Sequence, residues 1–266
     1  MTDRGLSADQ IDTSRPHPAR MYDYWLGGRD NYEVDREAAE TIILRSPVIV
    51  EAVRANRAFM RRAVRSLVAD YGIRQIIDIG TGIPTSPNTH EIAQSIAPDA
   101  HVAYVDNDPI VGVHANARLT GPGKTGFLLA DARKPEAILD HPVVRSLIDF
   151  DQPVGLVMIA LLHFIKDAED PAGIMATLRD ALPSGSYLAL SHGTADYAEQ
   201  DTEEATRVYD SSTASLNLRP YSEVAAFLDG FDLVEPGLVT VTDWRPDDDG
   251  DRGYRFGIYG AVARKP

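Results

Sequence analysis

The chain has 266 residues, 44% of them hydrophobic, which is enough for one large domain or one domain with an N-terminal extension. Forty acidic against 26 basic residues give a net charge of −14, which disfavours nucleic acid as a partner because its backbone is also negative. The absence of cysteine excludes disulfides, thiolate metal sites and a cysteine nucleophile. The polar first residues do not resemble a secretory signal and no apolar stretch reaches the length of a membrane span, so we expect a cytoplasmic protein without membrane contact.

Residues 1–72 are expected to form an N-terminal lead-in and a helical annex that acts as a lid. Pro16 and Pro18, without apolar periodicity around them, favour an extended lead-in. Helix-forming residues run from Glu33 to Arg45, and apolar residues then repeat at helical spacing from Val48 to Tyr71. The sequence therefore predicts two helices in the annex.

From residue 73 to 266, short apolar runs alternate with amphipathic segments, as in βα units of a parallel sheet. Two further strand-like runs near the C-terminus are joined through an acidic turn at 247–251, and strands without a helix between them usually pair antiparallel. We predict a doubly wound, Rossmann-like, mostly parallel α/β sheet of seven strands with an antiparallel edge strand. The expected strands are 75–79, 101–105, 126–129, 154–159, 187–190, 233–239 and 255–262.

Three helix starts are marked between these strands. Asp108 and Asp170 each precede a proline, and Asn88 stands three residues before Glu91. Each of these residues offers an N-cap, so Asp108 is better explained as a helix cap than as a ligand.

The ends of three neighbouring strands predict an adenosine site. The first strand runs through Asp78 into Gly80-Thr81-Gly82, where glycines allow a ligand to approach the backbone. The second strand ends at Asp106, the position that accepts hydrogen bonds from ribose hydroxyls. Asp131 follows the third strand and is suited to accept from an adenine amino group.

Structural interpretations of the same residues stay open. A glycine pair after a strand is often only a tight turn, and Asp131 also fits a cap for the segment that follows it. The main rival function is an NAD(P)-dependent oxidoreductase, whose fingerprint has a third glycine where this chain has Thr85 after Pro84. Proline suits a turn better than a helix N-terminus that binds pyrophosphate, which favours an adenosine cofactor without phosphates.

The motifs at Asp78–Gly82, Asp106 and Asp131 resemble those of class I S-adenosylmethionine (SAM)-dependent methyltransferases over residues 75–262. A narrower resemblance, to the actinobacterial S-adenosyl methyltransferase family formerly catalogued as a domain of unknown function, covers nearly the whole chain. Its first segment, Pro18-Ala-Arg-Met-Tyr-Asp-Tyr-Trp-Leu-Gly-Gly28, is not shared by methyltransferases in general. The other segments are 56–59, 81–85 with 88–91, 104–109, 162–164 and 182–187.

This resemblance implies that residues 73–266 form a methyltransferase domain whose cofactor is S-adenosyl-L-methionine. It assigns residues along the cofactor from its methionine end to its adenine: Asp78, Gly80, Thr81 and Gly82 at the methionine end, Asp106 at the ribose, and Asn107, Asp131 and Ala132 at the adenine. Many class I enzymes have a third glycine after Gly82, and its absence leaves the shape of this loop open.

Methyl transfer from a sulfonium is an in-line displacement, so the protein mainly aligns the acceptor and excludes water. Two residues that follow strands, His163 and less clearly His192, are candidates for a general base, and the resemblance puts His163 at the sulfonium side. Histidines at strand ends are also often satisfied by a neighbouring carbonyl.

The aromatic block from Met21 to Gly28 suits a lid, and we expect Tyr22 or Tyr24 to reach the cofactor. Packing of the annex against the sheet is the equal alternative for these aromatic residues. Arg57 and Arg61 are better explained as a solvated helix face than as partners of the cofactor carboxylate.

We therefore predict a SAM-dependent methyltransferase that methylates oxygen or nitrogen of a small molecule. The alternatives are a non-catalytic sensor or partner module that binds SAM or S-adenosylhomocysteine (SAH), and, less favoured, the oxidoreductase. No metal ion is expected, because the acidic run 247–251 lacks the glycine and glutamate spacing of a calcium loop. The sequence specifies neither the acceptor nor the oligomeric state, and a homodimer is compatible with it.

Overall fold

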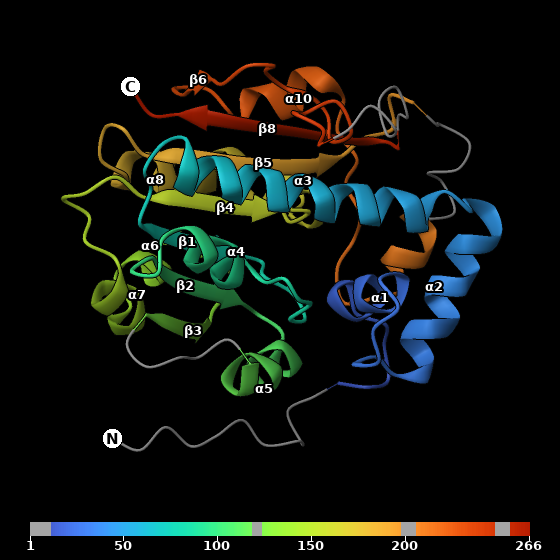
Figure 1. Cartoon of the computed structure of the whole chain (residues 1–266). Helices are drawn as coiled ribbons and strands as arrows, with labels where there is room; N and C mark the ends of the chain where they lie inside the picture. Colours follow the sequence, from blue (N-terminus) through green and yellow to red (C-terminus); the bar gives the residue numbers. More distant parts are fainter. Residues whose placement is uncertain (1–11, 119–123, 198–205, 248–255) are drawn as a thin grey trace.

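An eight-stranded mixed sheet forms the centre of the molecule (Figure 1), in a computed structural model that describes residues 12–118, 124–197, 206–247 and 256–266. The strand order is β3-β2-β1-β4-β5-β8-β6, with β7 also paired to β8. Strands β1 to β5 are parallel, whereas β8 runs antiparallel to β5, β6 and β7. The strands are β1 Gln75–Ile79, β2 His101–Asp106, β3 Thr125–Leu129, β4 Gly155–Ile159, β5 Tyr187–Gly193, β6 Asp232–Leu233, β7 Val239–Thr240 and β8 Ile258–Arg264.

Helices cover both faces of this sheet, because the strands are apolar on both sides and each face must be buried. The helices α3, α4 and α5 pack on one face, and α6, α7, α8 and α10 pack on the other. Their bounds are α3 Ile49–Ala69, α4 Thr89–Ile96, α5 Pro109–Arg118, α6 Pro135–Leu139, α7 Pro142–Leu147, α8 Pro171–Ala181 and α10 Tyr221–Ala226. The predicted doubly wound α/β class with an antiparallel edge is confirmed.

Two further helices, α1 Pro18–Trp25 and α2 Glu33–Arg45, lie beyond the carboxyl ends of the parallel strands (Figure 1). Among the described residues, no helix combines the length and the hydrophobicity that crossing a bilayer requires.

Helix starts follow the local chemistry of the sequence. Asp108 accepts from Ile110 N at 2.9 Å and Asp170 accepts from Gly173 N at 2.9 Å, each beside a proline in the first turn. Asn88 and Glu91 form a reciprocal capping box at the start of α4. All three predicted caps are therefore confirmed.

The helix α1 was not predicted, because aromatic residues and Gly27-Gly28 hide its periodicity. His17 accepts from Ala19 N through its side chain, and Pro18 occupies the first helical position. The pair His17-Pro18 is thus the signal from which this helix start is recognisable.

The predicted strand 233–239 is wrong as a single strand. Pro236 cannot donate to a ladder and Gly237 has φ +93°, so a turn separates β6 from β7. This break explains why the sheet has one strand more than predicted. In the predicted turn 247–251, Asp247 pairs with Arg65 at 2.8 Å, and the rest of the run lies outside the described residues.

The division of the chain at residue 72 stays a prediction. The helix α3, which precedes that point, contributes Phe59, Val64 and Leu67 to the same core as the strands. A separate apolar cluster, containing Met21, Trp25 and Ile42, holds α1 and α2 against the start of α3.

Candidate active site

A cavity of about 750 Å³ opens at the carboxyl ends of β1 to β4, beneath α1 and the first half of α3. This is the edge at which open α/β sheets bind ligands, where the strand order reverses between β1 and β4. Of the cofactor-binding residues predicted from sequence, all except Tyr24 line the cavity, namely Tyr22, Asp78, Gly80, Thr81, Gly82, Asp106, Asn107, Asp131 and Ala132.

The turn after β1 has the left-handed backbone that only glycine adopts without strain, with φ +76° at Gly80 and +66° at Gly82. A Cβ at Gly80 would lie 2.7 Å from Leu161 Cδ1, so a side chain there would also require Leu161 to shift. The chain after Gly82 stays irregular until α4 begins at Thr89. No helix N-terminus therefore follows these glycines directly, unlike in the dinucleotide fingerprint.

Asp106 ends β2 and closes this turn. Its two carboxylate oxygens accept from Gly82 N at 2.8 Å and from Asp108 N at 2.9 Å. Each oxygen has two lone pairs, so the carboxylate keeps acceptor capacity for a ligand's hydroxyls. Burial raises the pKa of Asp106 to about 6, while the backbone donors oppose this shift.

Asp78 feels the charge of Arg57, which the sequence interpretation assigned to a solvated helix face. It accepts from Thr89 Oγ1 at 2.6 Å, and burial raises its pKa to about 6 against the effects of Thr89 and Arg57. Arg57 lines the cavity and donates to the carbonyls of Thr85 and of Pro87, the latter at 3.0 Å. Its Nε is buried and has no hydrogen-bond partner among the described residues.

The prediction of a solvated face is therefore wrong for Arg57, because the α3 helix turns this residue under the loop that follows Gly82. Arg61, one turn later, is exposed as predicted. Met60 is buried and lies three residues after Arg57 on the same face of the helix, so the pattern of α3 itself turns Arg57 inward.

Asp131 is engaged by a neighbouring cation. Its carboxylate accepts from Arg133 N at 3.0 Å and from Arg133 Nε at 2.8 Å, and Arg133 also pairs with Glu169 at 2.6 Å. Although burial opposes it, hydrogen bonding from Arg133 lowers the pKa of Asp131. The local cap is thus present, and the assignment of Asp131 to adenine stays a prediction.

Of the two tyrosines expected in the lid, only Tyr22 reaches the cavity. Its buried hydroxyl donates to Val53 O at 3.2 Å and accepts from Asn56 Nδ2 at 3.1 Å. The hydroxyl of Tyr24 instead bonds the carboxylate of Glu40 on α2. Residues two apart on a helix point in different directions, so α1 does not direct both rings to the cavity.

The two histidines considered as bases differ in position. His163 lies in the 3₁₀ turn η2, Leu162–Phe164, after β4 and lines the cavity, whereas His192 is buried within β5 and does not line it. Both ring nitrogens of His192 are hydrogen-bonded, to Gly193 O at 2.6 Å and to Arg219 at 3.1 Å. A base role for His192 is therefore wrong, and burial lowers its pKa to about 4.

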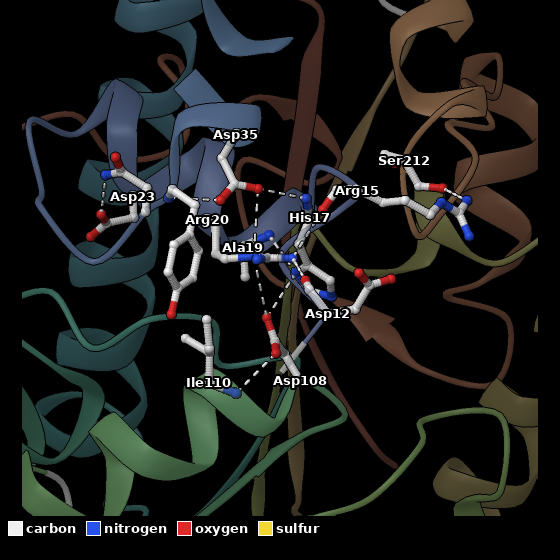
Figure 2. A network of polar contacts seen from close by, with 12 residues as sticks. Asp12, Arg15, His17, Ala19, Arg20, Asp23, Asp35, Asp108, Ile110 and Ser212 are labelled. Carbon is white, nitrogen blue, oxygen red and sulfur yellow. Dashed lines mark hydrogen bonds and ion pairs between the residues drawn. The ribbon is translucent and has the colours of Figure 1, made fainter. Parts of the chain in front are cut away.

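A buried charged network joins α1 to the end of β2 at the cavity (Figure 2). Arg20, 2% exposed, lies with its Nε 3.5 Å from Asp35 and 4.0 Å from Asp108. His17 Nδ1 lies 3.1 Å from the same Asp108 carboxylate. Because Asp108 N also bonds Asp106, the network connects the helix α1 to the predicted ribose acceptor.

The side of the cavity away from β2 and β3 is mostly apolar. Trp25, Ile42, Val53, Phe164 and Leu216 all line it, and they pack together in the cluster between α1, α2, α3 and residues 208–216. Within the described ranges, no group of three or more His, Asp or Glu side chains is arranged to hold a metal ion.

Comparison with known proteins identifies the family. A family model described as S-adenosyl methyltransferase matches residues 4–266. A DUF574 family protein from Streptomyces avermitilis MA-4680 is 48% identical, with a TM-score of 0.93, covering 96% of this chain and 100% of that one. A candidate methyltransferase from Thermobifida fusca YX is 37% identical, with a TM-score of 0.89 and 96% coverage of each chain.

More distant structures show the fold alone. The N-methyltransferase NodS from Bradyrhizobium japonicum WM9, crystallised with SAH, is 11% identical with a TM-score of 0.50, and the match covers 93% of this chain and 99% of that one. No curated protein sequence matches this chain. Because the family model spans nearly the whole sequence, the chain belongs to the S-adenosyl methyltransferase family and is a SAM-dependent methyltransferase with SAM as its cofactor.

Proposed function

We propose that the protein transfers a methyl group from SAM to an oxygen or nitrogen of a small, largely apolar molecule. The observation that carries this proposal is the division of the cavity into two parts. Acidic side chains and the glycine turn occupy the strand ends, and the apolar wall around Trp25 and Phe164 faces the annex. A volume of about 750 Å³ is within the range of sites that enclose small ligands.

The residues of the strand ends fit the cofactor. We assign the ribose to Asp106, because its buried carboxylate retains acceptor capacity, and the adenine to the segments at Asn107 and at Asp131–Ala132. The methionine end is assigned to the Gly80–Gly82 turn with Asp78 and Arg57. The carboxylate of Asp78 and the guanidinium of Arg57 both line the cavity and match the ammonium and the carboxylate of that end.

SAM supplies an electrophilic methyl group on a sulfonium, so the chain has little covalent chemistry to perform. Its residues bind, orient and exclude water. We propose that the N-terminal part of the predicted annex, α1 and α2, acts as the lid, with Tyr22 as its residue nearest the cofactor. The second half of α3 belongs with the sheet that it packs against.

Calorimetry followed by a transfer assay tests the proposal. SAM and SAH are expected to bind, and NAD is expected to give no heat. Methyl transfer from labelled SAM is then measured over a panel of phenols, carboxylic acids and amines. Binding without transfer to any acceptor in the panel would favour the sensor module, and binding of NAD would favour the oxidoreductase.

The affinity for SAH is expected to fall as the pH is lowered through about 6. Burial raises the pKa of both Asp78 and Asp106 to about 6, and protonation removes the acceptors that the ligand's hydroxyls and ammonium require. At one pH unit below such a pKa, roughly a tenth of each carboxylate is ionised, so affinity is expected to fall about tenfold for each. Calorimetry between pH 5 and pH 8 measures this change.

In the absence of ligand, the same two carboxylates have the opposite dependence on pH, because they lower the stability of the fold as the pH rises. Their folded pKa lies above the unfolded value, so the folded state binds more protons and they reduce its stability as the pH rises from about 4 to 6. Asp106→Asn is expected to flatten the dependence of affinity on pH. An SAH affinity that stays constant from pH 5 to pH 8 would contradict the assignment of these carboxylates.

A further inference from the structure

The orientation of the His163 ring is fixed by one backbone hydrogen bond. Its Nδ1 lies 3.0 Å from Gly193 N, and a backbone N–H only donates. Nδ1 is therefore the acceptor, and in the neutral ring the proton is on Nε2. A neutral ring also agrees with the pKa of His163. Burial, followed by the charges of His192 and Arg219, holds this pKa well below its usual value.

A chain of hydrogen bonds behind His163 enforces this state. Arg219 donates to His192 Nε2 at 3.1 Å, which leaves the His192 proton on Nδ1. That Nδ1–H donates to Gly193 O at 2.6 Å, and the neighbouring Gly193 N–H serves His163. The hydrogen bonds from Arg219 to His192 and from Gly193 to His163 each have a fixed donor. No other pair of histidine tautomers therefore satisfies the same bonds.

Arg219, the first donor of these hydrogen bonds, is held in place by several further bonds. Arg219 is 4% exposed and also donates to Leu162 O at 3.0 Å, Ile165 O at 2.8 Å and Asp167 at 2.6 Å. A Cβ at Gly193 would lie 2.8 Å from Leu218 Cδ2. Any other residue at position 193 would therefore require Leu218 to shift.

The other nitrogen of His163 is available to a ligand. His163 lines the cavity and is 7% exposed, and its Nε2 makes no hydrogen bond with the described residues. With its only lone pair used by Gly193, the neutral ring has a proton to give and no site to accept one.

We propose that His163 is a fixed hydrogen-bond donor to an oxygen of the methyl acceptor and is not its base. This inference rests on the proposed function. A donor of this kind favours an acceptor that carries negative charge on oxygen, such as an ionised phenol or a carboxylate. One lone pair of that oxygen accepts from Nε2–H, and another forms the bond to the methyl carbon while the carbon–sulfur bond breaks and leaves its electron pair on sulfur.

Nitrogen NMR tests the donor without any acceptor. Two-bond ¹H–¹⁵N spectra of the ¹⁵N-labelled protein at neutral pH are expected to show an Nε2–H tautomer for His163 and an Nδ1–H tautomer for His192. The signals are assigned from the spectra of His163→Gln and His192→Asn. An Nδ1–H tautomer or an imidazolium at His163 would overturn the proposal.

Two amide substitutions then separate a donor from a base. The amide nitrogen of His163→Gln replaces Nε2 and still donates, whereas His163→Asn reaches only as far as Nδ1. With an ionised phenol or carboxylate as acceptor, kcat/KM is expected to fall roughly 10- to 100-fold in His163→Asn and to recover most of that loss in His163→Gln. Equal losses in both variants, or none in either, would refute the role of donor.

Calorimetry with SAH is carried out on both variants, so that a loss of cofactor binding is distinguished from a loss at the methyl acceptor. If the NMR tautomers are as expected but wild-type enzyme methylates only amines, His163 does not select an oxygen acceptor and this inference fails while the proposed function stands. If SAH binds and no acceptor of any class is methylated, the proposed function itself fails.

Discussion

Replacing Asp106 with alanine is expected to weaken SAH binding by about 100-fold or more. Two hydrogen bonds from ribose hydroxyls to a charged carboxylate contribute roughly 1.5–3 kcal/mol each, and about 1.4 kcal/mol corresponds to a factor of ten in affinity. The substitution also removes the acceptor of Gly82 N, which holds the glycine turn against the end of β2. Isothermal calorimetry with SAH measures the loss directly.

Asp140→Ala is the matched control for this substitution. It removes the same charge, but Asp140 is exposed and pairs with Arg145, and neither residue lines the cavity. Its SAH affinity is expected to equal that of the wild type. An Asp106→Ala protein that binds SAH within a factor of about three of the control would show that the ribose lies elsewhere.

Asp35→Ala is expected to destabilise the protein by about 3–5 kcal/mol, the usual effect of leaving one member of a buried ion pair alone. Asp35 is fully buried, faces Arg20 at 3.5 Å, and accepts from His17 N and Tyr32 N, each at 2.9 Å. Without it, the Arg20 guanidinium loses a counter-charge and the start of α2 loses its cap. Urea unfolding followed by circular dichroism measures the change in free energy.

The control is an Arg–Asp ion pair on the surface. Arg65 and Asp247 lie 2.8 Å apart with about half of each side chain exposed, so Asp247→Ala is expected to cost less than about 1 kcal/mol. Equal destabilisation by the two substitutions would mean that the network in Figure 2 contributes little to the stability of the fold.

The parts of the site that depend on strand ends were predictable from the sequence. A run of apolar residues before Gly80 sets β1, and parallel neighbours then deliver Asp106 and Asp131 to the same edge. Each of these residues lies next to its own strand in the sequence, and the alternation of strands and helices brings the strand ends together. The cavity accordingly contains every cofactor-binding residue that was predicted from a strand end, whereas His192, considered as a base on the same ground, does not line it.

The parts that depend on tertiary packing were not predictable. Whether Arg57 faces solvent or the cavity is decided by the rotation of α3 against the sheet, and Tyr22 and Tyr24 were indistinguishable until α1 was known to be a helix. The role of His163 depends on Gly193 and Arg219, which lie 30 and 56 residues further along the chain. Hydrogen bonds over such separations leave no periodic signal in a sequence.

The cavity is built from two groups of segments. Turns after β1, β2 and β3 make the strand-end part, whereas α1, α2, the start of α3 and residues 209–218 make the part that contains the apolar wall. Substitutions in the second group that keep Arg20, Tyr22 and Arg57 leave the contacts of Asp106 and of the glycine turn untouched. A chimera that exchanges only these wall segments between family members is therefore expected to change which compound is methylated and to keep the same methyl donor.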